Sequence, residues 1–174
     1  MVGNNVVADQ ESRHFDGSTE WSLNMKVFED ISNLWDPFQI DLFASRLNYN
    51  VHDYVSWKPD PGAKFVNVFH MNWASSYFYC LPPFSVIASC LQKIEFQEAT
   101  GVILIPLWQT QPWFTTLLYL LIDIPLLPQS TNVLTQTHSG ALHPLRKRLR
   151  LLACRISSKA SSRATFQEKL QKLS

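Results

Sequence analysis

The sequence predicts an α/β fold with a small mixed or parallel sheet and flanking helices. Its candidate elements follow in the order strand, long loop, strand, helix, strand and helix, which is typical of α/β domains. Residues 101–108 (GVILIPLW) form a continuous apolar run of the kind that is buried on both faces of a sheet. A hydrophobic content of 46% and six tryptophans indicate a packed globule rather than a disordered chain.

The N-terminal part is expected to be helical before the first strand begins. Residues 6–13 (VVADQESR) predict one or two helical turns. Ser22 is a candidate N-cap for a helix that runs to about residue 34 and is ended by Asp36–Pro37. Residues 40–44 (IDLFA) then predict a short buried strand. The apolar face of the helix consists of Val27, Phe28, Ile31, Leu34 and Trp35.

The middle of the chain alternates between turn signals and apolar segments. Residues 49–76 are irregular, with a strong turn signal at 59–62 (PDPG). Residues 77–81 predict a strand that Pro82–Pro83 ends, and Ser85 is a candidate N-cap for the following helix. The inner face of that helix is expected to hold Val86, Ile87, Cys90, Leu91 and Ile94.

The C-terminal part predicts two further helices and a last strand. Thr110 and Pro112 are suitable residues to begin a helix that runs to about residue 121. Residues 129–143 indicate a polar loop, and residues 149–156 a final strand. The run TFQE at 165–168 fits a capping box that opens a short terminal helix.

Charge is distributed unevenly along the chain. Residues 1–143 contain six Lys/Arg and thirteen Asp/Glu, a net charge of −7, whereas residues 144–174 contain nine Lys/Arg and one Glu, a net charge of +8. This basic tail is either a contact for nucleic acid, a segment that docks on the acidic body, or a solvated linker. Arg146, Lys147, Arg148 and Arg150 (in RKRLR) are the candidate phosphate ligands, although the two leucines beside them also fit an edge strand with one basic face.

Cysteine usage and hydropathy favour an intracellular protein. Cys80, Cys90 and Cys154 are odd in number and lack CxxC spacing, so we expect buried reduced thiols. No secretory signal pattern begins the chain. The most apolar window, residues 113–127, is too short for a membrane span and carries Asp123. We therefore expect a cytoplasmic or nuclear location and no membrane partner.

Several motifs occur in an order that resembles a known enzyme family. IDLFASRLN is followed by Trp73, then by FYCLPPFSVIASCLQKI and GVILIPLWQTQPWF. The combination is similar to the phage-type Dam N6-adenine methyltransferase family, in which an Asp-x-x-Ala-Ser strand precedes Asn-Pro-Pro-Tyr and a helix. The positions that match in order are Asp41, Ala44, Ser45, Asn48, Trp73, Pro82, Pro83, Phe84, Pro106, Trp113 and Phe114.

More closely, the order of segments resembles the polyproteins of DIRS-type retrotransposons. GNNVVADQESR is similar to the end of a ribonuclease H domain, in which an aspartate at the position of Asp9 binds a catalytic metal. The tail, from HPLRKRLRLLACRIS to FQEKLQKL, resembles a linker that leads toward a tyrosine recombinase. The polymerase and recombinase domains of such an element are thus the implied partners.

These resemblances imply a division of the chain and a degenerate Rossmann-like methyltransferase core. Residues 1–19 would be a ribonuclease H remnant, 20–35 a connecting helix, 36–157 the methyltransferase-like domain and 158–174 a basic tail with a short helix. Asp9 stands without the other carboxylates that two-metal chemistry needs, so its metal role is expected to be vestigial.

The resemblance also implies a site, which is altered at its central position. In the family, an Asn or Asp before Pro-Pro accepts a hydrogen bond from the amine that is methylated, and the ring after Pro-Pro stacks on the flipped base. Pro82, Pro83 and Phe84 keep this turn, but Leu81 cannot accept a hydrogen bond. Loss of such an acceptor costs about 100–1000-fold in rate, so catalysis is not expected.

The cofactor and the function remain open between three hypotheses. Asp41 and Ser45 are the candidate contacts for S-adenosylmethionine, and the alternative for Asp41 is a carboxylate that caps nearby amides. The favoured hypothesis is a non-catalytic methyltransferase-like segment of a retrotransposon polyprotein, without a cofactor. The alternatives are a DNA N6-adenine methyltransferase that uses S-adenosylmethionine, and a decayed element copy without function.

Overall fold

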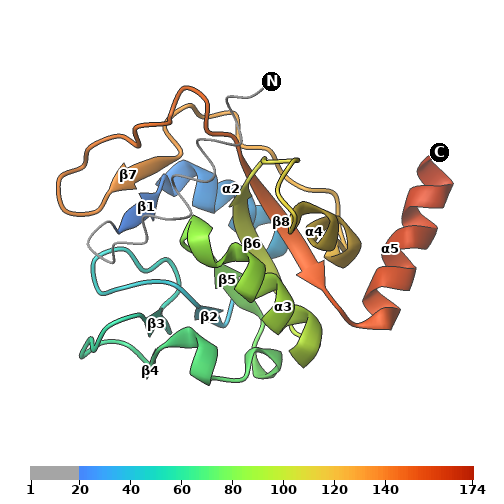
Figure 1. Cartoon of the computed structure of the whole chain (residues 1–174), viewed down its shortest axis with the longest axis horizontal. Coiled ribbons are helices and arrows are strands. Elements are labelled where there is room, and N and C mark those ends of the chain that lie inside the picture. The colour runs from blue at the N-terminus through green and yellow to red at the C-terminus, as the bar shows by residue number, and fades with distance from the viewer. Residues whose placement is uncertain (1–19) are drawn as a thin grey trace.

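The computed structural model describes residues 20–174, and the chain folds around one four-stranded sheet (Figure 1). The strands lie in the order β2 (Ile40–Asp41), β5 (Phe78–Cys80), β6 (Thr100–Pro106) and β8 (Leu151–Ser157). The first three are parallel, whereas β8 runs antiparallel to β6. The prediction of an α/β fold with a small mixed sheet is therefore confirmed. Residues 1–19, including Asp9 and the predicted turns at 6–13, lie outside the described residues.

Helices cover both faces of this sheet. On one face, α3 (Ile87–Gln97) and α4 (Phe114–Leu120) pack with Ile103 and Ile105 of β6. On the other face, α2 (Met25–Trp35) packs with Val102 and Leu104. Alternate residues of β6 thus enter two different cores, which explains why every position of the strand after Thr100 is apolar.

Gly101 allows β5 and β6 to lie close together. A Cβ atom at this position would lie 2.5 Å from the backbone carbonyl oxygen of Phe78, its partner in the strand register. Such a contact is far shorter than any that a real Cβ makes, so only glycine fits without a shift of the backbone.

Smaller elements surround the central sheet. The strand β1 (Trp21–Leu23) pairs antiparallel with β7 (Leu134–Gln136). Residues 49–76 contain β3 (Val55–Ser56), which pairs with β4 (Phe65–Val66). Three short 3-10 helices complete this layer: η1 (Val68–His70), η2 (Trp73–Ser75) and η3 (Phe84–Val86). The helix α5 (Ala160–Leu173) ends the chain at the edge of the molecule (Figure 1).

The predicted helix starts were wrong in four places. Ser22 lies in β1, and the first helix is capped by Asn24, whose Oδ1 accepts from the Lys26 amide at 2.9 Å. Ser85 lies within η3, and α3 begins without a side-chain cap. The helix expected to start near Thr110 begins at Phe114.

The fourth concerns the terminal helix. Thr165 lies inside α5, where its hydroxyl donates to the carbonyl of Ser161 at 3.0 Å, so it does not open a capping box. A side-chain oxygen can bond to several local backbone groups, and the sequence alone does not show which one it meets.

Strand bounds also differ from the predictions. The strand predicted at 40–44 is limited to Ile40–Asp41, and the loop predicted at 129–143 contains β7. The predicted connecting segment, residues 20–35, packs directly on the sheet through α2. All three cysteines are buried free thiols, as predicted. Among residues 20–174, no helix combines the length and the apolar character that a membrane span requires.

Candidate functional site

A pocket of about 510 Å³ lies where the parallel strands β2 and β5 end. Its walls come from the loop after β2 (residues 43–48), the turn after β5 (residues 81–85), residues 56–60 and the segment around His143. In open α/β sheets, ligands bind outside the carboxyl ends of the parallel strands. The position of the pocket therefore fits a binding site.

The turn after β5 is fixed by its two prolines. Pro82 and Pro83 have no backbone N–H, so the strand cannot continue its ladder past Cys80. The Pro83 carbonyl accepts from the Val86 amide at 3.1 Å, which begins η3 and then α3. Leu81, Pro82, Pro83 and Phe84 all line the pocket as a result. The side chain at the acceptor position of the resembled family is thus at the pocket wall, and it is apolar.

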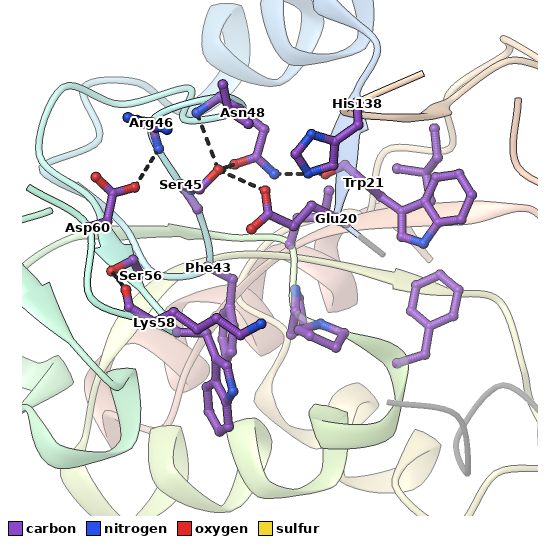
Figure 2. Close-up of a pocket in the computed structure, with 18 of the residues that line it drawn as sticks. Glu20, Trp21, Phe43, Ser45, Arg46, Asn48, Ser56, Lys58, Asp60 and His138 are labelled. Atoms are coloured by element: carbon purple, nitrogen blue, oxygen red, sulfur yellow. Dashed lines mark hydrogen bonds between the residues drawn. The ribbon is translucent and has the colours of Figure 1, made fainter. Parts of the chain in front are cut away.

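The loop after β2 is held by the side chain of Asn48 (Figure 2). Its Oδ1 accepts from the Ser45 amide at 2.7 Å, and its Nδ2 donates to the Trp21 carbonyl at 3.1 Å. The Ser45 hydroxyl donates to the Glu20 carboxylate at 2.8 Å. Ser45 therefore lines the pocket as part of a network of hydrogen bonds, with the Glu20 carboxylate beside it.

Two cationic residues and a second carboxylate complete the polar wall. Arg46 and Lys58 line the pocket, and both residues are exposed. Asp60 accepts from the Arg46 amide at 2.8 Å, from the Gly62 amide and from the Tyr54 hydroxyl. The backbone hydrogen bond from Arg46 is the largest cause that lowers the pKa of the Asp60 carboxyl. Asp60 is therefore an anion that fixes the loop, and the two exposed cationic residues line the pocket beside it.

Aromatic rings form the opposite wall. The centroid of the His143 ring lies 4.4 Å from that of the Trp21 ring and 6.3 Å from that of the Phe84 ring. Burial lowers the pKa of His143 to about 4, so the ring is neutral at pH 7. Its Nδ1 accepts from the Leu145 amide at 3.1 Å, which places the ring proton on Nε2.

Asp41, the second predicted cofactor contact, does not line this pocket. Its side chain is 1% exposed, and its two carboxylate oxygens accept from the Asn50 amide at 3.0 Å and the Phe43 amide at 3.4 Å. Burial raises the pKa of this carboxyl to about 7, against the effect of the two amides. The geometry is that of a strand-end carboxylate that caps loop amides.

The basic run lies along the same edge of the sheet, beyond the pocket. Arg148 and Arg150 line a second cavity of about 320 Å³, together with Trp108 from the end of β6. Arg146 and Lys147 lie in the preceding turn and do not line either cavity. The run is therefore neither an extended tail nor part of the strand β8, which begins at Leu151.

Several pocket residues had no sequence signal. Trp21, Lys58 and His143 lie outside both the IDLFASRLN motif and the Pro-Pro turn, and they reach the site through the β1–β7 pairing and the long loop. Conversely, Trp113 and Phe114, which match the resembled family, pack against the core. Within residues 20–174, no three His, Cys, Asp or Glu side chains are placed to hold a metal ion.

The pocket presents two walls of different chemistry. Aromatic rings on one wall and carboxylate, hydroxyl and cationic groups on the other match a ligand with both a flat ring and polar substituents. Where the resembled enzymes carry an acceptor for the reacting amine, the wall presents the isobutyl group of Leu81.

Comparison of the sequence with known proteins does not assign the chain to a family. No protein-family model matches it, and no curated protein matches it either.

Proposed function

We propose that the chain is a non-catalytic, methyltransferase-like segment of a retrotransposon polyprotein that retains a pocket for an adenine nucleoside. One observation carries the proposal. The loop with Ser45 and the turn Leu81–Phe84, more than thirty residues apart in the sequence, line one pocket at the carboxyl ends of two parallel strands. This is the place where α/β domains bind nucleotides.

The pocket fits an adenosyl group in size and chemistry. Ligand pockets typically measure about 300–1,000 Å³, and this one measures about 510 Å³. Phe84 and Trp21 offer flat apolar surfaces to a base, and the Glu20 carboxylate beside Ser45 offers an acceptor to ribose hydroxyls. S-adenosylmethionine would supply a methyl group, but Asp41 contributes nothing to holding it, since its carboxylate caps the loop instead.

Leu81 supports the non-catalytic assignment. An amine presented to the turn would find only one of its two acceptors, the backbone carbonyl, because the leucine side chain has no lone pair. Removal of one positioned acceptor costs about 100–1000-fold in rate. The remaining wall would still hold the base. Leu81 would therefore abolish methyl transfer without abolishing binding.

Binding is tested by isothermal titration of S-adenosylmethionine and of adenosine into the full chain. We expect a micromolar Kd for at least one of them, and at least a tenfold weaker Kd in Phe84→Ala. Phe96→Ala is the matched control, because Phe96 is 89% exposed and lies outside the pocket. A folded protein that binds neither compound would overturn the nucleoside pocket.

Catalysis is tested with radiolabelled S-adenosylmethionine and adenine-containing DNA. The wild type should transfer no methyl group, whereas Leu81→Asn restores the acceptor and should give measurable transfer. Leu81→Ala removes the same apolar side chain without adding an acceptor, so it should remain inactive. Transfer by the wild type would instead establish the DNA N6-adenine methyltransferase alternative.

A further inference from the structure

The second cavity lies at the same edge of the sheet as the nucleoside pocket. Leu107, Trp108 and Gln109 follow the carboxyl end of β6, and Leu149 and Arg150 precede β8. Because β8 is antiparallel to β6, its beginning meets the end of β6. The two cavities therefore follow one another along the edge formed by β2, β5, β6 and β8.

A thin wall separates the two cavities. Phe84 lines the first and Trp108 lines the second, and their rings meet edge to face with centroids 5.2 Å apart. The chain also passes directly from one cavity to the other, since His143 lines the first cavity and Leu145 lines the second. A ligand that continues past Phe84 would thus reach Trp108 next.

The second cavity combines an aromatic ring with unpaired positive charge. Arg148 and Arg150 are exposed, and neither makes an ion pair with any residue in the range 20–174. Trp108 is only partly buried, which leaves part of its ring accessible. Guanidinium groups beside an aromatic ring form the usual combination for the phosphates and the stacked bases of a single strand.

We propose that this second cavity binds the neighbouring nucleotide of a single-stranded nucleic acid whose base enters the nucleoside pocket. Arg148 and Arg150 would contact the phosphate, and Trp108 would stack on the next base. The proposal rests on the proposed function for its first subsite. It adds a single-stranded nucleic acid as the partner, because a free nucleoside would fill only the first cavity and leave the second one empty.

Single strands are favoured over duplexes for a physical reason. A base that stacks on Trp108 must present a free face and leave its partner, which costs little in a single strand and several stacking and pairing contacts in a duplex. A cavity of about 320 Å³ also has room for one nucleotide rather than for a double helix.

The test is fluorescence anisotropy of a labelled single strand of about twelve nucleotides, a length within the range that such sites cover. Arg148→Gln/Arg150→Gln should weaken binding at least tenfold. The slope of log affinity against log salt should become shallower by about 1.4, at about 0.7 for each lost phosphate contact. Trp108→Ala should weaken binding at least about fivefold, while Trp108→Phe should keep most of it.

Lys159→Gln/Lys172→Gln is the matched control for charge. Both lysines are exposed, and Lys159 follows the end of β8, at the opposite edge of the sheet from Arg150. The net charge changes equally, so an equal loss of affinity would show non-specific attraction and overturn the proposal. Equal affinity for single strand and duplex, or equally strong competition by free adenosine monophosphate, would overturn it as well.

The two proposals fail in distinguishable ways. If Phe84→Ala affects neither adenosine nor the oligonucleotide, while the arginine and Trp108 variants still weaken the oligonucleotide, the nucleoside pocket is wrong and the strand site stands alone. If adenosine binds but the arginine and Trp108 variants leave oligonucleotide binding unchanged, only the strand site is wrong.

Discussion

Asp41 shows how one buried carboxyl affects both the site and the stability. Its backbone begins the loop that carries Ser45, and its carboxylate fixes that loop through the Asn50 and Phe43 amides. Burial raises the pKa of Asp41 to about 7, above its ordinary value of 3.8. The folded state thus holds this proton more tightly than the unfolded state does. The stabilisation is fully present below about pH 4 and is lost as the pH rises through about 7.

His143 acts in the opposite direction. Burial lowers its pKa to about 4, so the unfolded state binds the proton more tightly. The resulting stabilisation is present above the unfolded pKa of about 6.5 and is lost as the pH falls toward 4. Between about pH 4 and 6.5 the two contributions therefore change in opposite senses and partly cancel in the wild type.

The first prediction uses this cancellation. In Asp41→Asn, the contribution of the carboxyl is absent, so the free energy of unfolding should rise with pH from about 4.5 to 6.5 more steeply than in the wild type, by on the order of a few kcal/mol across the window. Urea unfolding at several pH values measures this difference. Parallel curves for the two proteins would mean that Asp41 has an ordinary pKa in the folded state.

At the same scale, the sequence predicted part of the site. Ser45 and the turn Leu81–Phe84 were singled out by the resemblance to the methyltransferase family, and both line the pocket. The direction of the Asp41 side chain was not determined, because a strand-end carboxylate can point to a ligand or back to its own loop. His143 was not identified, since only the folded chain brings it to Phe84.

At the scale of elements, long strands were predicted from the sequence more reliably than short ones. The strand β6 was predicted almost completely, because the residues from Gly101 to Pro106 form an uninterrupted apolar run, which favours burial on both faces of a sheet. The strands β2 and β7 have only two and three residues. Their existence depends on a partner, and the partner of β7 is β1, more than a hundred residues away in the sequence.

The helix α2 gives the element-scale prediction. Its N-cap Asn24 accepts from the Lys26 amide and its own amide donates to the Val133 carbonyl at 2.9 Å, so it joins the helix to the segment before β7. Asn24→Ala removes the cap acceptor, together with the Nδ2 donor to the Asn132 carbonyl at 3.3 Å, and should lower the free energy of unfolding by about 1 kcal/mol. Asn24→Asp keeps an acceptor and should have a smaller effect. Thermal unfolding of the three proteins provides the measurement, and equal melting temperatures would contradict the cap.

At the scale of the whole molecule, the structure shows where the basic residues of the C-terminal part lie. The sequence suggested one basic tail, but the folded chain divides it between two places. Arg148 and Arg150 line the second cavity at the carboxyl edge. Lys159, Lys169 and Lys172 lie beyond β8, on or next to α5. Division of the cations by the antiparallel strand β8 could not be read from composition, because it depends on the strand's direction.

The helix α5 is attached to this molecule by few contacts. Phe166 is its one buried residue. The Arg163 guanidinium lies 4.1 Å from the centre of the Tyr119 ring, and Lys169 forms an ion pair with Asp123 at 3.4 Å. By contrast, β6 pairs on both sides with other strands and is buried in two cores. Elements with few buried apolar contacts open at lower free energy than the core does.

The last prediction follows from that difference. In native-state hydrogen exchange, the amides of α5 should exchange through local opening, far faster than those of β6 and β8, which require global unfolding. Phe166→Ala removes the one buried anchor and should accelerate exchange in α5 further, while exchange in β6 changes little. The exposed residue Leu173 offers the matched control, since Leu173→Ala removes apolar atoms from the same helix without loss of a buried contact. If α5 and β6 exchanged at the same rate and slowed or accelerated together, the helix would be part of the cooperative core, and its few contacts would have to be worth as much as the pairing of a central strand.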